Sequence, residues 1–138
     1  IGDYAGAYTD IPGNVRIEPF FPQPAVLPHT DLVVHHGGNN TFNEALYFGK
    51  PSLILPFCWD GLDNATHLQE TGYGLRLPRY TWTDAEFAAA LERLLTDGAM
   101  HRRLKDLSVH MQAADGRRKA ARLIDNLLRV SSAAPCTP

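Results

Sequence analysis

Cysteine is scarce in this chain of 138 residues, long apolar runs are missing, and neither sign of charge dominates. Its two cysteines, Cys58 and Cys136, show no metal-type spacing and no disulfide framework, so we expect a reducing, cytoplasmic location. No apolar run approaches the roughly 20 residues that a membrane-spanning helix needs. A net charge of −2 provides no general attraction for nucleic acid or for an anionic membrane. Any phosphate chemistry must therefore be local.

Two common phosphate-binding patterns are also missing. No Gly-Lys-Ser/Thr ending is present, which excludes a Walker loop, and the full dinucleotide-binding glycine pattern is absent as well. One basic run, Arg117 to Arg122, is best interpreted as the solvated face and start of the last helix. The chain therefore carries neither of these motifs, and no basic surface typical of nucleic-acid binding is predicted.

The order of predicted elements indicates an α/β fold. Short apolar runs and helix-like patterns alternate, and the chain then ends in helices. We expect strands at 15–20, 32–34, 52–55 and 74–77, and helices at 41–48, 64–71, after the N-cap Thr83, and at 100–113 and 117–130. This order predicts an open parallel sheet with Rossmann-like βαβ units and right-handed crossovers.

The last three helices each carry an apolar stripe that we expect to face inward. Thr83 and Glu86 have the spacing of a capping box, which fixes the start of the first of them. The stripes comprise Phe87, Leu91, Leu94 and Leu95, then Leu104, Leu107 and Met111, then Ala120, Leu123, Ile124 and Leu127.

The domain organisation is simple. Residues 1–130 are long enough for one domain with a real core, and residues 131–138 read as a disordered tail. The opening residues, IGDYAGAYTDIPGN, resemble the loop that follows a strand. We therefore expect the chain to be part of a longer polypeptide whose preceding strands are missing here.

The turn between the strand at 32–34 and the next helix carries the chemistry. Its sequence, His36-Gly37-Gly38-Asn39-Asn40-Thr41, lies where a parallel sheet binds its ligands, at the carboxyl end of a strand. Glycine lets a ligand approach the backbone, and a helix N-terminus attracts phosphate. His36, Asn40 and Thr41 add side-chain donors. Helix capping by Asn40 or Thr41 explains these residue types equally well, so both readings stay open at this point.

The neighbouring residues allow simpler readings. His35 is one residue out of register with His36, so we expect it to be structural and to point elsewhere. Asp63 and Asn64 most simply begin the next helix, with Asp63 as its cap. Trp59 either walls a ligand pocket or packs over the loop.

These motifs resemble a known family. The chain has "FFPQ" from Phe20, "HGGNNTFNEA" from His36, "GKPSLILP" from Gly49 and "DGLDNA" from Asp60, followed by "ETGYGLRL". Their order and spacing resemble the donor-binding signature of the nucleotide-sugar-dependent glycosyltransferases with two Rossmann-like domains, the GT-B type. That family includes the UDP-glucuronosyltransferases, plant glucosyltransferases and bacterial macrolide glycosyltransferases. The resemblance implies the C-terminal, donor-binding half of such an enzyme.

The resemblance also implies roles in binding the nucleoside. Phe20 would stack on the pyrimidine, where many members of the family have tryptophan, and Gln23 would lie beside the base or ribose. Glu44 would bind the ribose hydroxyls. Aromatic faces do stack on bases, and carboxylates do pair with neighbouring hydroxyls.

The diphosphate and the sugar receive the other implied contacts. His36, Asn40 and Thr41 would hold the diphosphate, and Gly38 would allow its close approach. Asp60 would accept hydrogen bonds from hydroxyls of the transferred sugar. Gly61 departs from the family, which usually has glutamine there, so an altered donor preference or a loss of activity is expected.

The implied function is transfer of a sugar from a UDP- or TDP-sugar to a small-molecule acceptor, with inversion. No metal or other cofactor is expected, and no catalytic residue lies in this chain, because the resemblance assigns the acceptor's base to the other domain. Two other readings stay open: a non-catalytic nucleotide-sugar-binding module or donor-binding subunit of a two-chain transferase, and a nucleotide-sugar epimerase of the same fold.

Overall fold

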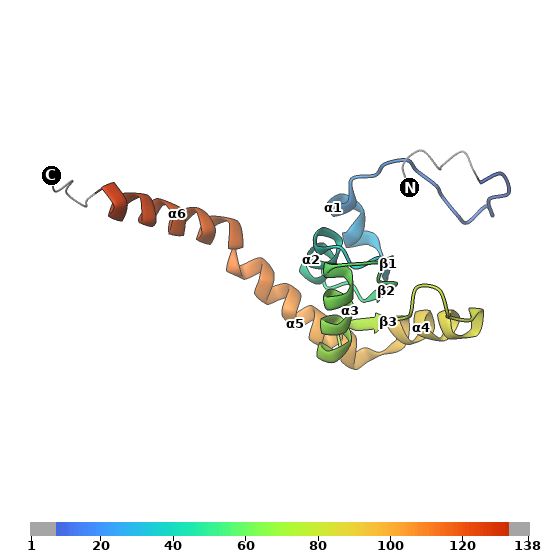
Figure 1. Ribbon diagram of the computed structural model, residues 1–138. Coiled ribbons are helices and arrows are strands. Elements are labelled where there is room, and N and C mark those ends of the chain that lie inside the picture. The colour runs from blue at the N-terminus through green and yellow to red at the C-terminus, as the bar shows by residue number, and fades with distance from the viewer. Residues whose placement is uncertain (1–7, 133–138) are drawn as a thin grey trace. The chain divides into compact units, whose positions relative to one another are not determined.

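The computed structural model describes residues 8–132, and the chain divides into two compact units (Figure 1). The first unit ends at Thr30 and the second begins at Asp31. Within the described residues, no helix is both long enough and apolar enough to cross a membrane.

In the first unit, the described residues from Tyr8 onward form only short helical turns. α1 spans Gln23–Val26 and the 3₁₀ helix η2 spans Leu27–His29. Pro22 is the N-cap of α1, and a further proline lies in its first turn, where the missing N–H would have no intrahelical partner.

The strand predicted at 15–20 is wrong. These residues form no strand, and most of them are exposed to solvent. Val15 instead donates its N–H to the carbonyl of Pro12 in a turn, and Arg16 pairs with Glu18 two residues away. A strand needs a partner strand to satisfy its backbone groups, and the described part of the first unit offers none.

The second unit is built around a parallel three-stranded sheet. The strands are β1 (Val33–His35), β2 (Ser52–Ile54) and β3 (Gly74–Arg76), in the order β1-β2-β3. Val34 is level with Leu53, and Leu53 is level with Leu75. The predicted open parallel α/β sheet is confirmed.

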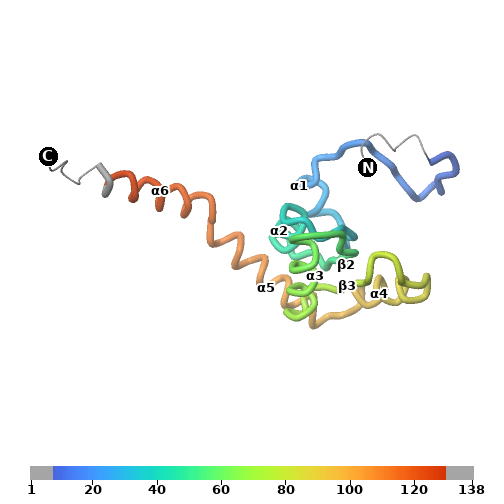
Figure 2. Tube along the Cα trace, in the orientation of Figure 1, coloured from blue at the N-terminus to red at the C-terminus, as the bar shows by residue number. Residues whose placement is uncertain are grey.

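Helices connect and cover these strands (Figures 1 and 2). α2 (Asn39–Tyr47) connects β1 to β2, and α3 (Asp60–Thr71) connects β2 to β3, which are the expected βαβ units. α4 (Asp84–Thr96) packs against β2 and β3, and α5 (Gly98–Ala114) packs against α2. α6 (Gly116–Ser132) follows.

The core lies around the central strand. Ser52, Leu53 and Ile54 of β2 are all buried, which explains why this strand reads as a continuous apolar run and does not alternate. The helices contribute a shared cluster of buried side chains: Phe42, Leu46, Ala65, Leu68, Leu94, Met100 and Leu104. This packed sheet fixes the positions at which the loops leave its carboxyl edge.

Most of the predicted helical stripes are confirmed, and part of them is wrong. Leu94 and Leu104 are buried, and Phe87, Leu91, Leu107 and Met111 pack partly buried against the core. Leu95 is exposed, because it follows Leu94 directly on the helix and therefore points about 100° away from the side that faces the core. The stripe on α6 is exposed too, from Leu123 to Leu127. Helical periodicity shows that a face is apolar but does not show what covers it.

The helix boundaries also differ from the prediction. α3 begins at Asp60 with Trp59 as its N-cap, so the assignment of Asp63 as the cap was wrong; Asp63 lies in the first turn, where a carboxylate suits the helix dipole. α6 continues to Ser132, so the first two residues of the predicted tail are helical. The rest of that tail, 133–138, lies outside the described residues.

Candidate functional site

The loop after β1 and the start of α3 enclose a surface hollow of about 430 Å³. The residues that line it are His36, Gly38, Asn39, Asn40, Thr41 and Asp60. Five of these six residues, all except Asn39, were predicted from the sequence as site residues, and the structure brings them together. The hollow lies past the carboxyl ends of β1 and β2, where open parallel sheets bind ligands.

Gly37 makes the turn that opens this hollow. Its φ of +93° lies in a region that residues with a side chain rarely adopt, and its N–H donates to Nδ1 of His35 at 3.1 Å. A Cβ added at Gly37 would lie 2.8 Å from the carbonyl oxygen of Gly61. Glycine is thus required at this position for both conformation and space.

Gly38 serves a different purpose. Its φ of −61° is open to any residue, so no special backbone conformation is needed. A Cβ at Gly38 would lie 2.5 Å from Nε2 of His36, because the exposed ring of His36 folds over this glycine. The absence of a side chain at Gly38 therefore makes room for the imidazole beside the hollow.

The N-terminal turn of α2 forms one wall of the hollow. Gly38 is the N-cap and has no side chain to cap the helix, so Asn40 and Thr41 are the second and third helical residues. The reading that Asn40 or Thr41 caps this helix is therefore wrong. The first intrahelical bond runs from the N–H of Phe42 to the carbonyl of Gly38, at 3.0 Å.

Asp60 supplies a cap from the neighbouring helix. Its Oδ2 accepts the N–H of Asn39 at 3.1 Å, across 21 residues of sequence. A carboxylate suits this position, because the N-terminus of a helix carries partial positive charge. The same carboxylate would repel an anion that approached the tip of α2.

The start of α3 lies in direct backbone contact with the turn. A Cβ added at Gly61 would lie 2.7 Å from the carbonyl oxygen of His36, closer than real Cβ contacts occur. Glycine at this position, where the resemblance implies glutamine, therefore does more than remove a side-chain amide. It allows α3 to begin directly against the loop that carries His36.

Asn64 was missed as a site residue by the sequence reasoning, which read it only as part of a helix start. Its Nδ2 donates to the carbonyl of Gly37 at 2.8 Å and to Oδ1 of Asn39 at 2.9 Å. The sequence signal was the asparagine that precedes the final alanine of the "DGLDNA" motif. Its partners lie 25 and 27 residues away, beyond the reach of a local pattern.

Trp59 precedes Asp60 in an uncommon backbone conformation. Its φ is +45° and its ψ is −127°, which is unfavourable for a residue with a side chain. Its side chain is 84% exposed, so the reading that it packs over the loop is wrong. It is not among the residues that line the hollow.

His35 points away from this chemistry, as expected. Its side chain is largely buried, and burial together with the nearby charge of His36 lowers its pKa from 6.5 to about 4. The neutral ring accepts the N–H of Gly37 on Nδ1. Its Nε2 is buried without a hydrogen-bond partner among the described residues.

Three of the predicted site residues lie elsewhere. Glu44 is half-buried on α2, one turn beyond Asn40, and does not line the hollow. Phe20 and Gln23 belong to the first unit, where they help to line a separate hollow of about 620 Å³. Phe20 is 81% exposed there, which leaves its ring face accessible. Their roles in binding stay predictions.

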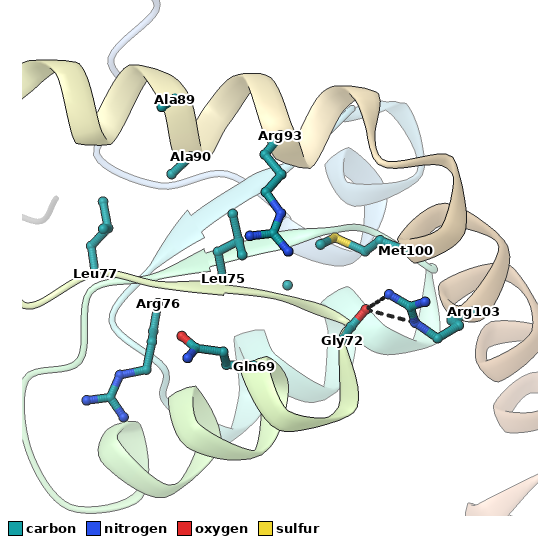
Figure 3. Close-up of a pocket in the computed structure, with 11 residues that line it drawn as sticks. Gln69, Gly72, Leu75, Arg76, Leu77, Ala89, Ala90, Arg93, Met100 and Arg103 are labelled. Atoms are coloured by element: carbon teal, nitrogen blue, oxygen red, sulfur yellow. Dashed lines mark hydrogen bonds between the residues drawn. The ribbon is translucent and has the colours of Figure 1, made fainter.

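The second unit contains another hollow, of about 480 Å³, and none of the predicted site residues lines it (Figure 3). It lies between α3, β3, α4 and α5, and Arg93 and Arg103 are among the residues that line it. Arg103 donates through Nε and Nη2 to the carbonyl of Gly72, at 3.2 and 2.9 Å. Asp97 caps α5 through the N–H groups of Ala99 and Met100, and these bonds lower the pKa of its carboxyl. The bonds of Arg103 therefore join α5 to the C-terminal end of α3, and those of Asp97 close the start of α5.

The fold and the first hollow define a class of protein. It is an α/β domain whose parallel strands present, at their carboxyl ends, a glycine turn, a helix N-terminus and a ring of polar side chains.

The chain belongs to the Erythromycin biosynthesis protein CIII-like family, as its C-terminal domain; the model of that domain matches residues 4–125. The prediction of a GT-B donor-binding domain made from the motifs is confirmed.

Named glycosyltransferases are among the relatives. The chain is 40% identical over 90 residues to the 3-alpha-mycarosylerythronolide B desosaminyl transferase of Saccharopolyspora erythraea, covering 65% of this chain and 21% of that protein. It is 34% identical over 124 residues to the demethyllactenocin mycarosyltransferase of Streptomyces fradiae, covering 90% of this chain and 27% of that protein. The chain thus spans about a fifth to a quarter of the length of these relatives.

Solved structures of glycosyltransferases agree with this family assignment. The glycotransferase of kitacinnamycin matches with a TM-score of 0.84 and 33% identity, over 91% of this chain and 33% of that chain. The spinosyn rhamnosyltransferase SpnG complexed with thymidine diphosphate matches with a TM-score of 0.74 and 29% identity, over 80% of this chain and 30% of that chain. Each of these enzymes is about three times as long as the part that this chain matches.

Proposed function

We propose that this chain binds the nucleotide-sugar donor in an inverting glycosyltransferase that acts on a small-molecule acceptor. The observation that carries the proposal is the hollow at the tip of α2, where His36, Asn40 and Thr41 meet beside Asp60. Membership of the family supports it, and so do the relatives, which are named as transferases and not as epimerases. These names also favour a transferase over a non-catalytic binding module.

The diphosphate of the donor would lie against the first turn of α2. Asn40 and Thr41 belong to this first turn, and a helix N-terminus is a ready site for phosphate because it carries partial positive charge. His36, folded over Gly38, would donate to a phosphate oxygen from the other side. We propose that this donor set acts without a metal ion or other cofactor.

The same donor set would assist the reaction. Negative charge grows on the departing diphosphate as the bond to the sugar breaks, and preorganised donors aimed at that charge lower the barrier. His36 and the N-terminus of α2 would supply these donors. The base that accepts the proton of the acceptor hydroxyl is proposed to lie in another domain, so we assign no catalytic base to this chain.

The rest of the donor would follow from the resemblance. We propose that Phe20 and Gln23 contact the base, that Glu44 binds the ribose hydroxyls and that Asp60 receives the sugar. A thymidine diphosphate complex of SpnG and a dTDP complex of VinC support TDP-sugars as donors. A SpnG complex with spinosyn aglycone supports an aglycone as the acceptor. A cytoplasmic location is proposed from the cysteine pattern alone.

Titration of the 138-residue chain with UDP, dTDP and sulfate, followed by amide NMR, tests this function. We expect either nucleoside diphosphate to shift signals of residues 38–44 at concentrations where sulfate does not. His36→Ala should weaken this binding, and His110→Ala, at an exposed position on α5, is the matched control. Equal responses to UDP, dTDP and sulfate, or none to any of them, would refute the proposed function.

A further inference from the structure

Asn64 joins two segments that the proposed function uses for different parts of the donor. Its side-chain amide donates to the carbonyl of Gly37, in the loop for the diphosphate, and to Oδ1 of Asn39 at the tip of α2. Asn64 itself belongs to α3, whose first residue is Asp60, the residue expected to receive the sugar. One amide therefore holds the sugar-binding segment against the diphosphate-binding loop.

Asn39 is held by α3 from two sides. Asp60 and Asn64 are four residues apart and so lie on the same face of α3. Asp60 accepts the backbone N–H of Asn39 at 3.1 Å, while Asn64 donates to the side-chain oxygen of Asn39 at 2.9 Å. A movement of the tip of α2 must therefore stretch at least one of these bonds or move α3 with it.

The bond to Gly37 also fixes an orientation. In a planar trans peptide the carbonyl and the following N–H point in opposite directions. Because Asn64 holds the carbonyl of Gly37 toward α3, the N–H of Gly38 is held pointing away from α3. Gly38 lines the hollow, so the direction of a backbone donor there depends on Asn64.

Close packing leaves little freedom to the joint between the loop at His36 to Asn39 and the start of α3. The backbone of Gly61 lies so near His36 and Gly37 that neither glycine has room for a Cβ. The joint therefore moves as a unit, since its atoms are already in contact and cannot shift independently.

We propose that Asn64 is a positioning residue that couples occupation of the diphosphate loop to the position of Asp60. The inference rests on the proposed function, because it assigns the loop to the diphosphate and Asp60 to the sugar. Binding of a nucleoside diphosphate that carries no sugar should then alter the start of α3 as well as the loop.

Asn64→Asp in the 138-residue chain tests this coupling, with UDP as the probe. The change keeps the size of the side chain but replaces the donating amide with oxygens that face two acceptor oxygens, so both bonds are lost. We expect the affinity for UDP to fall about tenfold. We also expect the amide shifts that UDP causes at residues 60–64 to disappear, while those at 40–44 remain.

Asn43→Asp is the matched control. Nδ2 of Asn43 also donates to residue 39, to its carbonyl oxygen at 2.7 Å, but Asn43 is exposed and this bond stays within α2. It adds the same charge near the same helix tip without touching the joint. We expect its UDP-induced shifts at residues 60–64 to match those of the unmodified chain.

The outcomes separate the two proposals. If the unmodified chain binds no nucleoside diphosphate, the proposed function fails. If it binds UDP but Asn64→Asp behaves like Asn43→Asp, the coupling is overturned. A measurement on the unmodified chain covers the case in which Asn64→Asp does not fold: the side-chain amide of Asn64 should exchange more slowly than that of Asn43 and should shift when UDP is added. Equal exchange with no shift overturns the inference.

Discussion

At the scale of single residues, the acidic side chain in the hollow has two opposed effects. Asp60 stabilises the tip of α2 by accepting the N–H of Asn39, and it places negative charge where a diphosphate is proposed to bind. A donor sugar with hydroxyl groups gives this carboxylate a partner, whereas a nucleoside diphosphate alone does not. The residue should therefore favour the complete donor over the product.

Asp60→Asn tests this balance. The amide oxygen can still accept the N–H of Asn39, but the charge is gone, so we expect the affinity for UDP to rise about threefold to tenfold. The affinity for a UDP-sugar should rise less or fall, and calorimetry of both ligands measures the ratio. Asp63→Asn, in the same first turn of α3, is the control. A ratio unchanged from the unmodified chain would contradict the assigned role of Asp60.

Gly61 gives a second prediction at this scale. Gly61→Ala should weaken UDP binding and cost about 1 to 3 kcal/mol of stability, because a Cβ there meets the carbonyl oxygen of His36 at 2.7 Å. Gly116→Ala, where a Cβ meets nothing within 4 Å, should cost nothing. Urea unfolding measures the stability of both variants, and titration with UDP measures the binding.

Gly61→Gln carries the same steric cost. The altered donor preference expected from the sequence should therefore appear together with a loss of stability, and a donor screen in a full-length enzyme that contains this chain measures the preference. The steric argument is wrong if Gly61→Ala and Gly116→Ala are equally stable.

His35 gives a prediction about pH. Because its pKa is lowered from 6.5 to about 4, the unfolded chain binds a proton at this residue more readily than the folded chain. Its contribution to stability is complete above pH 6.5 and is lost as the pH falls toward 4. The loss at about pH 5 should be on the order of 2 kcal/mol.

Urea unfolding near neutral pH and near pH 5 measures this loss. His35→Gln should remove the corresponding part of the pH dependence, because glutamine does not titrate. An unchanged pH dependence in His35→Gln would show that His35 is not the group responsible.

At the scale of elements, helix ends were predicted well where their determinants are local. Thr83 and Glu86 do form the capping box: Thr83 accepts the N–H of Glu86, and Glu86 accepts the N–H of Thr83 at 2.7 Å. The start of α3 was predicted four residues late, because Asp63 has the right type for a cap while the actual turn is made by Trp59 in a conformation that no pattern of residue types indicates.

The capping box should contribute measurably to α4. Thr83→Ala removes the side chain that accepts the N–H of Glu86 and should cost about 0.5 to 2 kcal/mol in urea unfolding. Thr96→Ala, near the other end of the same helix, removes only a hydroxyl that bonds back to the carbonyl of Glu92, and its cost should be near zero. Equal costs would show that the box does not stabilise this helix.

At the scale of the whole molecule, the sequence predicted the architecture from short-range patterns. Alternating strands and helices gave the parallel sheet. The segment after β1 contains four of the predicted residues that line the hollow, and the fifth, Asp60, was expected from the family resemblance. The strand at 15–20 and the burial of α6 were wrong, because both depend on what lies opposite in space. Asn64 was missed for the same reason, since its bonds join segments far apart in sequence.

The contrast between core and α6 can be measured. Leu104→Ala should cost about 2 to 5 kcal/mol, because Leu104 is fully buried between elements of the core. Leu127→Glu should change the unfolding free energy by less than about 0.5 kcal/mol, because Leu127 is exposed on α6. Fluorescence-detected unfolding of both variants decides this, and a large loss in Leu127→Glu would show that α6 packs against the core.

The glycine-on-glycine contact between the turn and the start of α3 also limits how this protein can change. A Cβ at Gly37 meets the backbone of Gly61, and a Cβ at Gly61 meets the backbone of His36, so a larger residue at either position forces the two segments apart. In a library with both codons randomised, surviving clones should therefore retain glycine at both positions. This shared constraint ties the evolution of sugar preference at position 61 to that of the phosphate loop.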